Sequence, residues 1–400
     1  MMKKILINLL LCFAFWHSFA ENPVKKTIEF DGYEREYLLY TPENAREFDG
    51  LIVGLHGFNN SPDAFFGSLD LSAIADSLNY VIVAPKALPE QSQDVIKWAN
   101  FLGDIQLNSV WGCGLTVTSS LLNIELNETI DDAGFLDTLI GTVLSEYAVN
   151  PKNLFLIGVS MGGYMAYQYA LPYGHRLSGM VSIAGTMGTA IKGLEKPAPV
   201  PVCDFHSLSD EVVPYTGIGS YTLFPGVLYL PVTLGKPKSE VIDYWVSRNE
   251  AGEALVEDFP EGNGITVKKF TYPHPEHEVI HYQADGAKHA YVFAKADGDG
   301  MDYKEEIVKF FADHLVENNE NSGIGKIDKQ RLYFYSNPAN NTVYFSDETG
   351  IFSVYDMTGR LLFSQSFYDR QADVSGLKSG VYIVRISSGG KTLTGKLLKN

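Results

Sequence analysis

Short apolar runs alternate with longer amphipathic stretches between residues 27 and 315. A strand that is buried on both faces of a parallel sheet has such a continuous apolar sequence. Strands are therefore predicted at residues 33–40, 51–55, 80–84, 154–157, 180–184, 200–205 and 278–282. Amphipathic periodicity predicts helices at residues 132–147, 162–170, 239–249 and 303–316. Strands separated by helices predict the α/β class, with a doubly wound, mostly parallel sheet covered on both faces.

The pattern changes after residue 316, where polar residues dominate and no helix periodicity follows. Short strands then alternate with turns rich in Asn, Asp and Gly. We therefore expect an α/β domain over residues 21–316, a linker over residues 317–331 and a small all-β sandwich over residues 332–400.

The amino terminus has the pattern of a secretory signal peptide. Lys3 and Lys4 precede an apolar run, and small residues end the segment at Ala20. We expect residues 1–20 to be removed on export. The apolar run is too short to span a bilayer, and no later segment is long and apolar enough, so no membrane span is predicted.

The charge of the chain narrows the range of partners. The formal net charge is −17, and removing the predicted leader with its two lysines makes the chain more acidic still. Such a surface repels phosphate backbones, so nucleic acid is not an expected partner.

Cys113 and Cys203 remain in the exported chain. Either a disulfide joins them or they are two separate buried thiols, and both readings stay open.

The strongest chemical signal is the segment Gly158-Val159-Ser160-Met161-Gly162, a G-x-S-x-G pattern. It follows a predicted buried strand and begins a predicted helix, which is the context of a nucleophile elbow. Glycines on both sides allow the tight turn that exposes the Ser160 hydroxyl. The Met161 amide lies at the helix start, where it can hold the oxyanion of a tetrahedral intermediate.

A serine nucleophile needs a carboxylate and a histidine, which follow it along the chain in this topology. Asp210 comes just after the strand at residues 200–205, at the edge of the sheet where the elbow also lies. Two neighbouring carboxylates are weaker alternatives for the acid: Asp204, which lies within the strand, and Glu211, which follows Asp210 in the turn. Asp210 is therefore the predicted orienting carboxylate.

His289 is the predicted general base because it lies in the loop after the last strand. His274, His277 and His281 precede that strand or lie inside it, and they are interpreted as surface or packing residues. The second oxyanion donor is expected from the loop after residues 51–55, at the Phe58 amide. In that loop, His56 is interpreted as a brace.

Several segments resemble the secreted polyhydroxybutyrate depolymerase and feruloyl esterase group of α/β hydrolases. The matching residues are 55–57, 130–136, 158–167, 206–215 and 239–249. The resemblance implies hydrolysis of carboxylic esters through an acyl enzyme, without metal or cofactor, by Ser160, Asp210 and His289. Ser207 replaces a family glycine, and Tyr291 and Val292 replace a tryptophan and a proline.

The tail resembles the type A sorting domain of the Bacteroidetes type IX secretion system, at residues 335–341, 354–360, 374–385 and 391–396. This resemblance implies recognition by an outer-membrane translocon and delivery to the cell surface or the medium. A carbohydrate-binding sandwich is the competing interpretation of the tail.

Together these features predict a secreted serine esterase that acts on an ester-bearing polymer or its oligomers. Feruloyl or acetyl esters of plant polysaccharide are favoured slightly over polyhydroxyalkanoate. Two alternatives stay open. The same triad serves serine peptidases, and a non-catalytic surface adhesin could use a hydrolase scaffold.

Overall fold

The computed structural model describes residues 23–399 except 44, 104, 121–122, 193–197, 225–227, 263, 290–300, 317–333, 336–338, 340, 346 and 357–358. The predicted signal peptide and linker lie outside the described residues, as do Tyr291 and Val292. None of the described helices is long and apolar enough to cross a bilayer.

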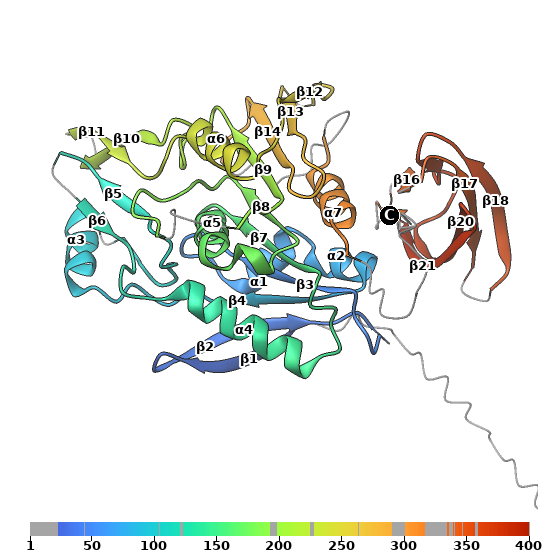
Figure 1. Ribbon diagram of the computed structural model, residues 1–400, viewed down its shortest axis with the longest axis horizontal. Helices are drawn as coiled ribbons and strands as arrows, with labels where there is room; N and C mark the ends of the chain where they lie inside the picture. The colour runs from blue at the N-terminus through green and yellow to red at the C-terminus, as the bar shows by residue number, and fades with distance from the viewer. Residues whose placement is uncertain are drawn as a thin grey trace, which may run out of the picture.

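A ten-stranded sheet runs through the larger part of the molecule (Figure 1). Its strands lie in the order β1 (Val24–Phe30), β2 (Tyr33–Tyr40), β4 (Tyr80–Pro85), β3 (Gly50–Leu55), β7 (Leu154–Val159), β8 (Gly179–Ile183), β9 (Val202–Ser207), β14 (Val279–Asp285), β13 (Thr266–Tyr272) and β12 (Leu255–Asp258). From β4 to β14 every neighbouring pair is parallel. The outer strands pair antiparallel at both edges. The predicted mostly parallel sheet is confirmed, although the sequence patterns did not reveal β1, β12 and β13.

Helices cover both faces of this sheet, as the sequence predicts. On one face lie α4 (Asp132–Glu146), α5 (Met161–Tyr173) and α6 (Lys238–Arg248). On the other face lie α1 (Pro62–Ser68), α2 (Leu71–Leu78) and α7 (Tyr303–Asp313). A further helix, α3 (Gln93–Gly103), follows β4 along the chain.

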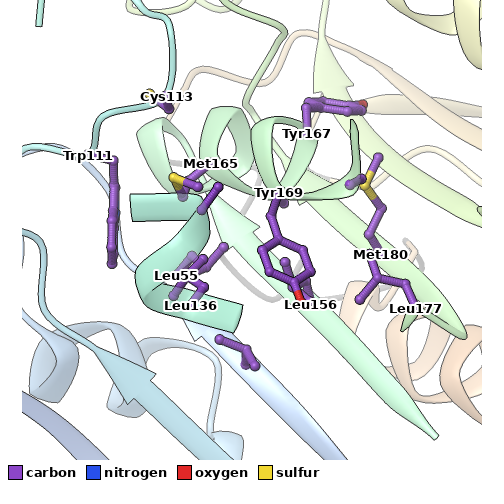
Figure 2. Close-up of a cluster of buried hydrophobic side chains, with 14 of the residues drawn as sticks. Leu55, Trp111, Cys113, Leu136, Leu156, Met165, Tyr167, Tyr169, Leu177 and Met180 are labelled. Carbon is purple, nitrogen blue, oxygen red and sulfur yellow. The ribbon is translucent and has the colours of Figure 1, made fainter. Parts of the chain in front are cut away.

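Strand β7 shows how the central strands fill both cores. Leu154 and Leu156 pack in the core under α4 and α5, whereas Phe155 and Ile157 pack under α1, α2 and α7. This division follows from the two-residue period of a strand, whose successive side chains point to opposite faces. Figure 2 shows Leu156 among the side chains of the first core, with Leu136, Met165 and Tyr169. The uninterrupted apolar sequence of the strand is thus explained by burial on both sides.

Cys113 and Cys203 are free, buried thiols, so the disulfide considered from the sequence is wrong. The reason is the sheet itself. Cys113 packs in the core under α4 and α5 (Figure 2), whereas Cys203 points from β9 into the core on the opposite face. A layer of backbone separates the two sulfur atoms, and a disulfide requires their Cα atoms to lie within about 7 Å.

A second, smaller sheet that the sequence patterns did not predict lies beside the main one (Figure 1). Its strands are ordered β10 (Ile218–Phe224), β11 (Leu228–Thr233), β5 (Thr116–Thr118) and β6 (Asn123–Glu125). Two hairpins that are far apart in the sequence meet where Thr233 pairs with Thr118. The loops after β4 and β9 are joined by this pairing.

The described part of the tail is all β. One sheet contains β15 (Phe334–Tyr335), β16 (Thr342–Phe345) and β19 (Gln371–Asp373). The other contains β18 (Leu361–Phe367), β17 (Gly350–Tyr355), β20 (Gly380–Ser388) and β21 (Lys391–Lys399). Phe345 and Phe367 stack with ring centroids 4.0 Å apart inside a core shared by both sheets. The small β-sandwich predicted from the turn pattern is therefore present.

Candidate active site

Ser160 occupies a sharp turn between β7 and α5. Its φ and ψ are 54° and −119°, a region that non-glycine residues rarely adopt. The surrounding backbone leaves no room for side chains, because a Cβ atom on Gly158 would lie 2.0 Å from the carbonyl oxygen of Gly162. The Ser160 amide donates a 2.8 Å hydrogen bond to the carbonyl oxygen of Ile183, which fixes the turn against β8. The local geometry is that of a nucleophile elbow.

The structure brings the three residues of the predicted triad together. Nε2 of His289 lies 3.1 Å from Oγ of Ser160, and Nδ1 of His289 lies 2.8 Å from Oδ2 of Asp210. These residues follow β7, β9 and β14, so all three lie beyond the carboxyl ends of parallel strands. The sheet order therefore assembles groups that are up to 129 positions apart in the sequence.

The Asp210 side chain is buried and held from two directions. Its Oδ1 atom accepts hydrogen bonds from the amides of Val212 and Val213, at 2.9 and 2.8 Å. Burial alone would raise the pKa of Asp210, but the hydrogen bonds from His289 and Val213 outweigh it and hold the pKa below its usual value. An ionised Asp210 keeps the ring proton of His289 on Nδ1, so that Nε2 presents its lone pair to Ser160.

Glu211, the neighbouring carboxylate, has a different position. Its Oε2 atom accepts a 3.2 Å hydrogen bond from the backbone amide of His289 rather than from the ring. Glu211 therefore supports the base loop from the outside, while Asp210 contacts the imidazole.

The loop after β3 passes directly beside the nucleophile. A Cβ atom on Gly57 would lie 3.4 Å from Cβ of Ser160. His56 braces this loop, as the sequence predicts: its Nδ1 donates to the carbonyl oxygen of Gly57 at 2.7 Å, and its Nε2 accepts from the amide of Ala87 at 3.1 Å. The Trp111 indole donates to the carbonyl oxygen of His56 at 2.9 Å. The backbone of Phe58, the next residue, is thereby held close to the elbow.

Residues 43–220 match the Phospholipase/Carboxylesterase family model. Residues 333–400 match the model of a secretion system C-terminal sorting domain. The first match supports a carboxylic ester hydrolase, and the second confirms the sorting domain expected from the tail pattern.

Two curated proteins are similar to part of this chain. One is the bifunctional acetylxylan esterase/xylanase XynS20E of Neocallimastix patriciarum, 22% identical over 48% of this chain and 23% of that protein. The other is the putative esterase NocK of Nocardia uniformis subsp. tsuyamanensis, 25% identical over 22% of this chain and 26% of that protein. The chain thus spans about a quarter of the length of each relative.

Solved structures with similar folds include two esterase-type hydrolases. An acetyl xylan esterase from Aspergillus awamori is 12% identical, with a TM-score of 0.44 over 72% of this chain and 98% of that chain. An S-formylglutathione hydrolase from Agrobacterium tumefaciens is also 12% identical, with a TM-score of 0.45 over 73% of this chain and 95% of that chain.

Asp204, the alternative acid, lies in the esterase region but away from the serine. It is fully buried on β9, where it accepts hydrogen bonds from Lys238 at 2.7 Å, from His281 at 2.8 Å and from Tyr167 at 2.9 Å. Burial alone would raise the pKa of Asp204, but the Lys238 ammonium and His281 hold it far below its usual value. Asp204 is therefore the centre of a buried polar cluster with Lys238, His281 and Tyr167.

The sequence reasoning missed Lys238. His281 is a buried packing residue, as predicted, and stacks on Phe270, but its hydrogen bond to Asp204 was not foreseen. Lys238 is fully buried although it begins the polar-looking helix α6, and Nε2 of His281 accepts from the Tyr215 hydroxyl at 3.0 Å. No local pattern marks either residue, because each is paired with a carboxylate on another element. Within the described part of the chain, no group of three His, Cys, Asp or Glu residues is arranged to hold a metal ion.

Proposed function

We propose that this protein is a serine esterase that hydrolyses carboxylic esters through an acyl enzyme. The observation that carries the proposal is the continuous chain of contacts from Asp210 through His289 to the Oγ atom of Ser160. A serine hydroxyl attacks carbonyl carbon only when a base removes its proton, and the Nε2 atom of His289 is placed to do so. The Phospholipase/Carboxylesterase match over residues 43–220, which include Ser160 and Asp210, supports the same chemistry.

In the proposed reaction, Oγ of Ser160 bonds to the carbonyl carbon while its proton moves to Nε2 of His289. The carbonyl oxygen becomes an oxyanion, which the amides of Met161 and Phe58 stabilise. The amide of Met161 suits this role because the first amides of a helix have no partner within the helix. The tetrahedral intermediate then expels the alcohol, which takes the proton from His289. Water activated by the same imidazole hydrolyses the acyl enzyme and restores Ser160.

The proposed substrates are esters carried by a polymer or its oligomers, with acetyl or feruloyl esters of polysaccharide ahead of polyhydroxyalkanoate. The similarity to a bifunctional acetylxylan esterase/xylanase supports this choice. Exposed apolar side chains at Phe58 and Val212 flank the triad on two loops, which suits an apolar acyl group. The acidic chain also fits a neutral polysaccharide better than a polyanion.

We further propose that the protein works outside the cell. The predicted leader at residues 1–20 would direct the chain across the inner membrane, and the sorting domain at residues 333–400 would direct it through the outer-membrane translocon of the type IX system.

The test is a substrate panel with the purified chain that lacks only residues 1–20. We expect turnover of acetylated xylan or methyl ferulate, slower turnover of polyhydroxybutyrate, and none of aminoacyl anilides. A fluorophosphonate probe should label the wild type and leave Ser160→Ala unlabelled. Equal labelling of both proteins would refute the assignment of Ser160 as the nucleophile. Faster cleavage of anilides than of esters would indicate a peptidase. The absence of both ester turnover and probe labelling would favour the non-catalytic adhesin.

A further inference from the structure

A second histidine lies behind the triad, where the proposed reaction does not use it. His206 is fully buried near the end of β9, and both of its ring nitrogens contact backbone carbonyl groups. Nδ1 lies 3.1 Å from the carbonyl oxygen of Gly185, and Nε2 lies 2.8 Å from that of Val213. Nε2 also lies 3.5 Å from Oδ2 of Asp210. The ring therefore bridges two loops.

One of these loops carries the acid. The Val213 amide donates to Oδ1 of Asp210 at 2.8 Å, while its carbonyl oxygen contacts Nε2 of His206. The position of Val213 thus sets the position of the carboxylate. A shift of the Val213 backbone would move Asp210 relative to His289, to which Asp210 is hydrogen bonded.

The other loop lies directly under the nucleophile. A Cβ atom on Gly185 would be 2.8 Å from the carbonyl oxygen of Ser160 and 2.7 Å from Cα of Gly163, so its backbone packs against the elbow. The Ser160 amide is also bonded to Ile183 in the same segment. His206 therefore connects the support of the elbow with the support of the acid.

The contacts also assign the ring proton of His206. The carbonyl oxygen of Gly185 already accepts a hydrogen bond from the ammonium group of Lys238. Burial and the charge of Lys238 lower the pKa of His206 to about 4, so the ring carries one proton near neutral pH. We place that proton on Nε2, where it is donated to Val213 and faces Asp210, so Nδ1 contacts the Gly185 carbonyl group by packing and not by a hydrogen bond.

We propose that His206 is a positioning residue that holds Asp210 in register with the elbow at Ser160. The proposal rests on the esterase function proposed above. His206 contacts no reacting atom and acts through the backbone of Val213. Loss of the Nε2 hydrogen would leave the buried Val213 carbonyl group without this donor, and the acid loop would shift to find another. A misplacement of about 1 Å near a catalytic group costs about a hundredfold in rate.

Three substitutions separate this role from simple packing. His206→Gln places an amide N–H near the site of Nε2, His206→Asn places one near the site of Nδ1, and His206→Leu offers none. We expect kcat for p-nitrophenyl acetate to fall about a hundredfold in the Leu and Asn variants, with KM within about threefold of the wild type. The Gln variant should keep kcat within about fivefold of the wild type. His314→Gln is the matched control, because His314 donates to Phe310 at the end of α7 and should not affect kcat.

Labelling rates with a fluorophosphonate, measured on protein shown to be folded by urea denaturation, give a second readout. The proposal is supported if kcat and the labelling rate stay near the wild-type values in His206→Gln but fall in His206→Asn. The positioning role would be overturned if all three variants had the same kcat, or if kcat fell only in proportion to the fraction of folded protein. Either result would leave the esterase function intact. A wild type that neither turns over esters nor reacts with the probe would overturn the proposed function and this inference together.

Discussion

Asp210 accepts a 2.8 Å hydrogen bond from Nδ1 of His289, while the adjacent Glu211 accepts a 3.2 Å hydrogen bond from the backbone amide of the same residue. Two neighbouring carboxylates thus support one histidine in different ways. Ring orientation depends on Asp210, and backbone placement is assisted by Glu211.

This difference predicts unequal effects of two amide substitutions. Asp210→Asn removes the charge that stabilises the imidazolium and favours the wrong tautomer, so kcat should fall on the order of 10³–10⁴-fold. Glu211→Gln can still accept from the His289 amide and should cost less than about tenfold. Steady-state hydrolysis of p-nitrophenyl acetate measures both. Similar losses in the two variants would contradict the assignment of the acid.

Substitution by alanine should have opposite effects on stability at two glycines, one in the elbow and one in a distant helix. A Cβ atom on Gly162 would lie 2.0 Å from the carbonyl oxygen of Leu55, so Gly162→Ala forces the backbone apart and should lower the free energy of unfolding by about 3 kcal/mol. Gly141 lies in α4, and a Cβ atom there would have no neighbouring atom within 4 Å. Gly141→Ala should therefore raise that free energy by about 0.5–1 kcal/mol. Urea denaturation measures the free energy of unfolding of the two variants. If both substitutions lowered it, the steric explanation would be refuted.

A buried ion pair between β2 and α4 predicts strong coupling. The guanidinium of Arg35 lies 2.6 Å from Oδ1 of Asp132, and both side chains are buried. Removing one partner leaves the other charge uncompensated, so Arg35→Met should cost about 3–5 kcal/mol. The double variant with Asp132→Asn should recover part of that loss. A double-mutant cycle by chemical denaturation tests the coupling, and additive effects would show that the pair contributes little.

The buried brace at His56 predicts sensitivity to acid. Burial lowers the pKa of His56 to about 4, whereas histidine in an unfolded chain titrates near 6.5. Between about pH 4 and pH 6.5 the unfolded state therefore binds more protons, so stability from this residue is complete above pH 6.5 and is lost as the pH falls.

The expected loss from His56 is about 2 kcal/mol between pH 7 and pH 5, at about 1.4 kcal/mol per pKa unit. Free energies of unfolding of the wild type and His56→Gln, measured by urea denaturation at both values, isolate this contribution. The variant should lose about 2 kcal/mol less than the wild type over that interval. Parallel pH profiles would show that His56 is not the residue responsible.

The sorting domain predicts the fate of a shortened chain. Deletion of residues 333–400 should abolish release to the medium or cell surface in a host with a type IX system and leave active esterase in the periplasm. Immunoblots and ester turnover of the cell fractions measure this. A control that places the tail behind an unrelated exported protein should send that protein outside. Unchanged export of the shortened esterase would favour the carbohydrate-binding interpretation of the tail.

The sequence reasoning succeeded where function depends on the ends of buried strands. Ser160, Asp210 and His289 each follow a short, mainly apolar strand, and parallel strands place their carboxyl ends along one edge. Their chain order was therefore sufficient to predict that they meet.

Features that depend on distant pairing could not be found in this way. Arg35 and Asp132 are 97 positions apart, and Thr118 pairs with Thr233 across an even longer stretch. Local periodicity carries no record of such partners. Cys203 illustrates the same limit, because a strand buried on both sides gives no sign of which face receives a given side chain.

The position of β14 has a consequence for when the enzyme becomes active. This strand is the last in sequence to enter the parallel part of the sheet, and it brings His289 to residues that were synthesised long before it. Before β14 pairs with β9, the protein has a serine but no base. A chain that crosses the inner membrane unfolded would therefore remain chemically silent during that step, and its first turnover would report that the sheet had closed.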